Sequence, residues 1–186
     1  MTTPLYERLV GEAWQRLPTV VRGAHLASAP VRARGAFRVT RGANRVARAL
    51  ATLLRLPPAG DRTPILLEIT PHGAGEKWFR TFGRSRLTTR QYESGDGLLA
   101  ERFGPVELCF RLVVDGDSLC YEQRRVRLCL GPLRVGVPRR LAPRVAARES
   151  AAAGARGTHV IVAVELPLVG LLIRYEGKLQ LIAEPQ

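Results

Sequence analysis

The chain has 186 residues, of which 46% are hydrophobic and 24% are charged. This composition excludes a disordered chain, and the length suits one domain whose core needs no disulfide or metal support. The formal net charge is +13, and arginine supplies nearly all of the basic side chains. Two explanations of this charge stay open, namely a patch for phosphates or anionic lipid heads and a set of solvated arginines.

The odd number of cysteines, without a C-x-x-C pair, indicates a reduced and therefore cytoplasmic protein. Charged residues within the first twelve interrupt any apolar run, so we expect no signal sequence. The longest apolar stretch, residues 160–173, is too short for a membrane helix and contains Glu165 and Pro167. We therefore expect a protein that does not span a membrane.

The first 58 residues alternate between helical and extended patterns. Apolar residues at helical spacing predict a helix over 3–17, which Pro18 ends. Residues 32–42 alternate small or apolar side chains with arginines and predict a strand with one solvated face. A second helix is expected over 43–58, with an apolar stripe as its buried face. That stripe consists of Val46, Leu50, Leu53 and Leu54.

From residue 64 onward nearly every segment has the period-two pattern of a strand. The exceptions are residues 131–143, where prolines deny a central strand, and residues 144–157, which predict a short helix or a mobile loop. The chain ends in a hairpin of residues 158–167 and 170–182. Segments predicted as strands run over 64–70, 76–83, 86–94, 98–104, 106–114 and 119–130.

These elements predict an α+β protein. We expect an N-terminal helix and a second helix packed on a strongly curved, hairpin-rich antiparallel sheet that forms a half-barrel, because such curling covers the core and limits open edges. Residues 1–186 are expected to form a single domain, with a helical segment over 1–58 and a β-rich body over 59–186.

Motifs that would indicate an enzyme are weak. The stretch GDGLLA (95–100) matches a dinucleotide fingerprint but lies between strands, which favours a hairpin turn. The three histidines are far apart, and no metal-binding or nucleophile motif surrounds them. We therefore assign no catalytic residue, no metal ligand and no cofactor, and an enzyme is not the favoured class.

Trp78, Arg80 and Phe82 occupy alternating positions and would share one face of a strand. If that face points inward, Arg80 needs a carboxylate or carbonyl partner, because an unpaired buried charge costs several kcal/mol. Glu101 is the first candidate, ahead of Glu68 and Glu93. Two explanations stay open: an ion pair or exposed guanidinium with a structural role, and an arginine that receives a ligand in an apolar cleft.

Several blocks of the sequence, among them GAFRVTRG, EKWFRTFG and AERFGPVELCFRL, together resemble the bacterial domain-of-unknown-function family 4166. The resemblance covers nearly the whole chain. Members of that family occur alone or joined to oxidoreductase-like or membrane segments, and this chain resembles the stand-alone type. The family has no settled activity, so the resemblance implies no catalytic residue.

The leading hypothesis is a non-catalytic binding module whose apolar cleft holds a small hydrophobic or lipid-like ligand. One alternative is a binder of nucleic acid or an anionic surface, and another is an auxiliary domain of an oxidoreductase system. The candidate ligand-binding residues are Trp78, Arg80, Phe82, Glu101, Phe110 and Tyr175. The candidate residues for an anionic surface are Arg32, Arg34, Arg38, Arg41, Arg45 and Arg48.

Overall fold

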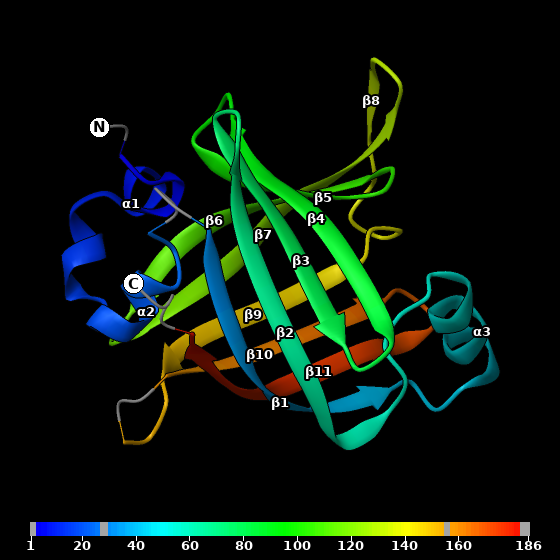
Figure 1. The fold of residues 1–186 in the computed structure, drawn as a ribbon. Helices are drawn as coiled ribbons and strands as arrows, with labels where there is room; N and C mark the ends of the chain where they lie inside the picture. Colours follow the sequence, from blue (N-terminus) through cyan, green and yellow to red (C-terminus); the bar gives the residue numbers. More distant parts are fainter. Residues whose placement is uncertain (1–2, 27–29, 155–156, 183–186) are drawn as a thin grey trace.

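A computed structural model describes residues 3–26, 30–154 and 157–182 and shows a β-barrel with short helices at its two ends (Figure 1). Ten antiparallel strands close the barrel, and β8 is an extra strand beside β7. The strands are β1 (Val31–Arg41), β2 (Gly60–His72), β3 (Gly75–Phe82), β4 (Ser85–Ser94), β5 (Leu98–Phe103), β6 (Val106–Asp115), β7 (Ser118–Leu130), β8 (Leu133–Gly136), β9 (Arg144–Ala151), β10 (Thr158–Leu166) and β11 (Gly170–Leu181).

The half-barrel expected from the sequence is wrong, because the sheet closes on itself. Strand β7 pairs with β6 on one side, and its residues 119–122 pair with β9 on the other. Strand β9 then pairs with β10, and β11 pairs with β1. Residues 144–151, expected as a helix or loop, are therefore the strand that completes the circle.

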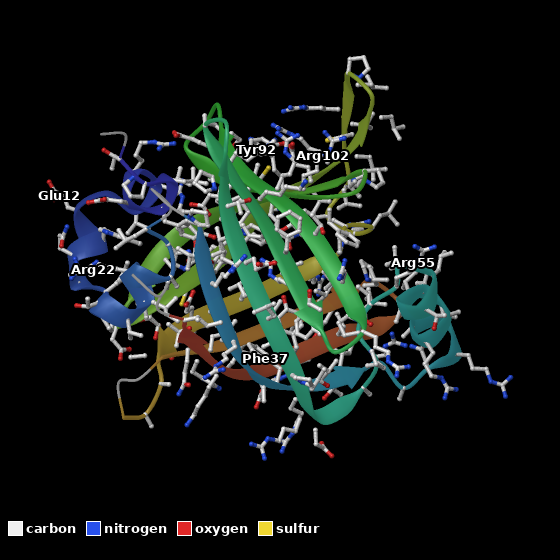
Figure 2. The ribbon with its side chains drawn as sticks, in the orientation of Figure 1. Glu12, Arg22, Phe37, Arg55, Tyr92 and Arg102 are labelled. Carbon is white, nitrogen blue, oxygen red and sulfur yellow. The ribbon has the colours of Figure 1, made fainter. Side chains whose placement is uncertain are left out.

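The single helix expected over 3–17 is also wrong, because this stretch is divided into α1 (Leu5–Val10) and the 3-10 helix η1 (Gly11–Arg16). A further short helix, α2 (Thr19–Gly23), follows Pro18. Gly11 has a φ of 66°, a left-handed conformation that ends an α-helix and that glycine adopts without strain. The pieces curl over one end of the barrel, where Glu12 and Arg22 are labelled in Figure 2.

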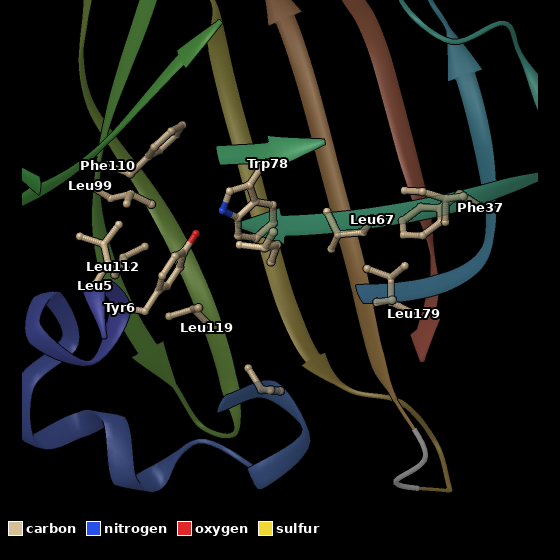
Figure 3. Close-up of a cluster of buried hydrophobic side chains, with 14 of the residues drawn as sticks. Leu5, Tyr6, Phe37, Leu67, Trp78, Leu99, Phe110, Leu112, Leu119 and Leu179 are labelled. Carbon is tan, nitrogen blue, oxygen red and sulfur yellow. The ribbon is translucent and has the colours of Figure 1, made fainter. Parts of the chain in front are cut away.

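The hydrophobic core lines the barrel interior and continues under this N-terminal segment. Tyr6 and Trp14 have 0% and 2% of their surface exposed, and Tyr6 points from α1 into the barrel beside Leu119 (Figure 3). Phe37, Phe82 and Tyr175 form an aromatic group with ring centroids 5.2 to 6.0 Å apart. Burial of a large apolar side chain contributes about 1.5–3 kcal/mol to stability. Because Tyr6 and Trp14 are buried in this way, the N-terminal segment is a part of the core.

Helix α3 (Arg45–Leu53) lies outside the opposite end of the barrel (Figure 1). It buries Ala47 and Ala51, whereas Val46, Leu53 and Leu54, expected in its buried stripe, are exposed. A Cβ at Gly42 would lie 1.8 Å from the Leu171 carbonyl oxygen and 2.7 Å from the Ala47 Cβ. This close approach admits only small side chains, so the helix packs through its alanines. No helix among the described residues has the length and apolarity to cross a bilayer.

Candidate functional site

The barrel contains a cavity of about 90 Å³ that reaches the surface beside Arg148 and Leu181. Its walls are mostly apolar side chains such as Phe37, Leu67 and Val160, which come from β1, β2 and β10. A water molecule needs roughly 10–15 Å³ measured in this way, so the cavity has room for several waters or one small molecule. The polar lining consists of His25, Arg80, Gln91, Glu101, Tyr121, Arg148, Glu149, Thr158 and Tyr175.

Arg80 and Glu101 form an ion pair at the cavity wall. The Arg80 Nη1 atom is 3.1 Å from Glu101 Oε1 and donates a 2.9 Å hydrogen bond to Thr89 Oγ1. The Thr89 hydroxyl in turn donates to Glu101 Oε1 at 2.8 Å. The two charged side chains are 14% and 17% exposed, so the pairing with Glu101 that we expected from the sequence is confirmed.

The surroundings keep this arginine charged. Burial on its own would lower the pKa of Arg80, but the Glu101 carboxylate more than offsets that effect and the pKa is raised. The guanidinium carbon also lies 4.7 Å from the centre of the Trp78 ring, within the range of a cation–π contact. Arg80 is therefore a fixed cation in the barrel interior.

A second polar group joins the N-terminal segment to the barrel wall. His25 Nε2 is 2.8 Å from Glu149 Oε2, and the His25 ring stacks on Tyr6 with centroids 3.9 Å apart. The Tyr6 hydroxyl donates to Gln91 Oε1 at 2.6 Å and accepts from the Tyr121 hydroxyl at 3.2 Å. Burial raises the pKa of both tyrosines well above the ordinary value, so both hydroxyls stay protonated and able to donate.

Two buried polar atoms near this group have no hydrogen-bond partner among the described residues. They are His25 Nδ1 and Glu76 Oε1. The other oxygen of Glu76 accepts a 2.9 Å bond from Trp78 Nε1, and burial raises the pKa of this carboxyl. A buried polar group without a partner costs about 1–3 kcal/mol, so both atoms are open to a further donor or acceptor.

The structure brings most of the candidate ligand-binding residues together. Trp78, Arg80, Glu101, Phe110 and Tyr175 all line the cavity. Phe82 is buried, but it packs in the aromatic group with Phe37 and Tyr175. Their role in binding a ligand remains a prediction.

Sequence reasoning missed the pair of His25 and Glu149. These residues are separated by 124 positions, and no local pattern links them. The only signal was a histidine in an apolar stretch, whose one charged neighbour within three positions is Arg22. Their proximity comes from the barrel, which places α2 over the end of β9.

The six arginines proposed for an anionic surface lie on two elements, β1 and α3, and their role in binding remains a prediction. Arg32 pairs with Glu68 at 2.9 Å and Arg38 with Asp61 at 3.7 Å. Arg41 donates from Nε to the Pro57 carbonyl at 2.8 Å, which holds the chain that follows α3. Arg34 lies on the outer face of β1, while Arg45 and Arg48 are exposed on α3. The expected patch is therefore divided between the barrel wall and the helix.

Residues 17–179 match the family described as a domain of unknown function, DUF4166. The chain belongs to the DUF4166 family. The matched region begins just after η1 and ends within β11, so it includes β1 to β10 in full and most of β11 of this DUF4166 barrel. Comparisons with the curated proteins and with the solved structures found no match. Within residues 3–26, 30–154 and 157–182, no three His, Cys, Asp or Glu side chains gather as a metal site.

Proposed function

We propose that this DUF4166 barrel is a binding module for a small ligand with an apolar body and an uncharged polar head. The observation that carries the proposal is the internal cavity, which combines apolar walls with the Arg80–Glu101 and His25–Glu149 pairs. Ligand sites in proteins have this combination of apolar lining and a few convergent polar groups.

The pairing of charges favours an uncharged head. A carboxylate ligand on Arg80 would compete with Glu101, and displacing Glu101 would leave a buried charge without its partner at a cost of several kcal/mol. A hydroxyl, carbonyl or amide group avoids this cost. Arginine has five N–H donors and a carboxylate has about four acceptor positions, so both residues keep capacity for a neutral ligand while they remain paired.

The size of the cavity limits the ligand. Pockets for drug-sized molecules measure about 300–1,000 Å³, and an engineered cavity of about 150 Å³ binds benzene. The cavity here measures about 90 Å³. A ligand of roughly four to six non-hydrogen atoms suits this space. A lipid-like ligand, as considered from the sequence, would extend beyond this space, so the proposal made here is for small molecules that fit within it.

The test uses calorimetry and thermal unfolding with cyclopentanol, butan-2-one and 1-butanol as probes. At a concentration of one hundred times Kd, a bound probe stabilises the folded protein by about 2.7 kcal/mol. Ala147 on β9 lines the cavity and its neighbour Ala146 is exposed. We expect Ala147→Leu to fill the cavity and abolish the effect of the probes, and Ala146→Leu to preserve it.

Val162→Phe on β10 provides a second way to fill the cavity if the Ala147 variant does not fold. Probe binding that survives both filling variants would place the site elsewhere and overturn the proposal. Failure of all three probes to bind the wild-type chain, with no small molecule retained in native mass spectrometry, would also overturn it.

A further inference from the structure

Helix α3 and the β10–β11 turn carry apolar side chains that the barrel does not cover. The exposed fractions are 77% for Leu53, 56% for Val46, 40% for Leu54 and 104% for Leu168. The turn and the helix are joined, because the Asn44 side chain at the start of α3 donates to the Val169 carbonyl. We call Val46, Leu53, Leu54 and Leu168 the apolar rim.

Cations flank the apolar rim. Arg45, Arg48 and Arg55 are exposed on or just after α3, and the helix contains no acidic residue. Figure 2 shows Arg55 at this end, where side chains with nitrogen tips spread from α3 away from the barrel. None of these three guanidinium groups forms an ion pair with a carboxylate of the described residues. Glu165, at the end of β10, is an acidic neighbour of the turn.

The backbone at the apolar rim is unusual. Leu168 and Arg55 have φ values of 65° and 53°, and they are the two non-glycine residues with positive φ in the described chain. A bulky residue rarely adopts this left-handed conformation, and strained positions of this kind concentrate at functional sites. A leucine that protrudes from such a turn has no packing role in the barrel, so its position requires a different explanation.

We propose that the apolar rim docks on the surface of an anionic lipid bilayer. Leu53 and Leu168 would enter the boundary between headgroups and acyl chains, and Arg45, Arg48 and Arg55 would lie at the lipid phosphates. A second copy of the chain fits less well, because a two-fold contact through this surface would bring the arginines of both copies together. A nucleic acid would use the cations but would leave the leucines in water.

The experiment is cosedimentation of the full chain with vesicles of phosphatidylglycerol and phosphatidylcholine, with pure phosphatidylcholine vesicles as the neutral comparison. We expect binding to the anionic vesicles. Each basic residue near an anionic surface contributes roughly a fivefold gain, so Arg45→Gln with Arg48→Gln should weaken binding by about 25-fold. The matched control is Arg16→Gln with Arg111→Gln, which removes the same charge from exposed positions outside α3.

The apolar contribution is tested with the double variant Leu53→Gln with Leu168→Asn, which preserves the net charge. Asparagine at position 168 tolerates the positive φ of the turn. We expect this variant to bind the anionic vesicles about tenfold more weakly, or weaker still. The matched control is Leu133→Gln with Leu141→Gln, on the β8 hairpin and the loop that follows it, where both leucines are also exposed. This control should bind like the wild type.

Three results would overturn the proposal. They are no binding to anionic vesicles, equal losses in the rim variants and their controls, and vesicle binding that survives the leucine substitutions. In the last case, binding of a random DNA duplex with the same dependence on Arg45 and Arg48 would identify nucleic acid as the partner. None of these results bears on the internal cavity, so this proposal and the proposed function fail separately.

Discussion

Two glutamates, Glu107 and Glu76, are almost fully removed from solvent on opposite faces of the barrel wall. Glu107 projects from β6 on the outer face, and Glu76 projects from β3 on the inner face beside Trp78. Both oxygens of the Glu107 carboxylate accept hydrogen bonds, Oε2 from Tyr92 and Oε1 from Arg127 at 3.1 Å, and Arg134 forms an ion pair with it at 3.8 Å. The Glu76 carboxylate has one donor and one oxygen without a partner.

The different partners shift the two carboxyl groups in opposite directions. Burial by itself raises a carboxyl pKa, and for Glu76 that effect prevails, so its pKa is raised. For Glu107 the Tyr92 hydroxyl and the two guanidinium groups outweigh burial, so its pKa is lowered. The outer group is a completed structural cluster. The inner face retains unused hydrogen-bonding capacity near a cavity, which is what a ligand site requires.

The largest effect is expected for the inner ion pair. Arg80→Met leaves Glu101 as a buried charge without its partner and should lower the free energy of unfolding by about 3 kcal/mol. The double variant Arg80→Met with Glu101→Met should recover most of that loss, because two apolar side chains suit the barrel interior. Urea denaturation of the wild type, Arg80→Met, Glu101→Met and the double variant measures both effects. A neutral Arg80→Met variant would mean that the pair is solvated.

Removal of the outer glutamate should cost less. Glu107→Gln deprives Arg127 and Arg134 of their partner, but these side chains are 25% and 51% exposed and can turn to water. We expect a loss of about 2 kcal/mol, set by the hydrogen bonds to the charged group. Urea denaturation under the same conditions shows whether Glu107→Gln loses less stability than Arg80→Met. A loss greater than that of Arg80→Met would remove the distinction between the two clusters.

The pH dependence of stability should have opposite signs for the two glutamates. The folded pKa of Glu76 is raised above its ordinary value of 4.5, so the protein loses stability as pH rises from about that value through the folded pKa. The folded pKa of Glu107 is lowered, so its contribution is present above 4.5 and is lost as pH falls through the folded pKa.

The measurement is the difference in Tm between the wild type and each variant from pH 3.5 to 7. The Tm of the wild type minus that of Glu76→Gln should shrink as pH rises. The Tm of the wild type minus that of Glu107→Gln should grow. Equal slopes for the two variants would contradict the assignment of one satisfied and one unsatisfied carboxylate.

The smallest effect is expected at Tyr92, where burial and the Glu107 carboxylate raise the pKa to about 12. Tyr92→Phe removes one hydrogen bond and leaves both arginines on Glu107, so it should cost about 1 kcal/mol. Thermal unfolding of this variant and of Glu107→Gln measures how much of the stability contributed by Glu107 comes from the Tyr92 hydroxyl. If the two variants lose the same stability, the arginines contribute nothing and the outer cluster reduces to the tyrosine contact.

The strands in which apolar and polar residues alternate regularly could be predicted from the sequence. Alternation in segments such as residues 106–114 indicated strands, and the W-x-R-x-F pattern indicated that Arg80 would face inward and require a carboxylate. Both inferences depend on local geometry, because a strand alternates its faces whatever it pairs with. The hairpin turns determined most neighbours in the sheet for the same reason.

Closure of the barrel could not be predicted in this way. Residues 144–151 contain three alanines and a glutamate, which have weak strand propensity, and only their pairing with β7 and β10 makes them a strand. Likewise, the close packing at Gly42 selects the alanine edge of α3 in preference to its leucines. The approach of His25 to Glu149 depends on the closed barrel and has no local signature.

The most direct test of the ligand-binding barrel is a crystal structure of the protein grown with cyclopentanol. We expect a closed ten-stranded barrel with the probe in the cavity, its ring against Phe110 and its hydroxyl within hydrogen-bond distance of Arg80 or Glu101. An interior in which these side chains close the cavity, with the probe absent or bound only on the outside, would contradict it.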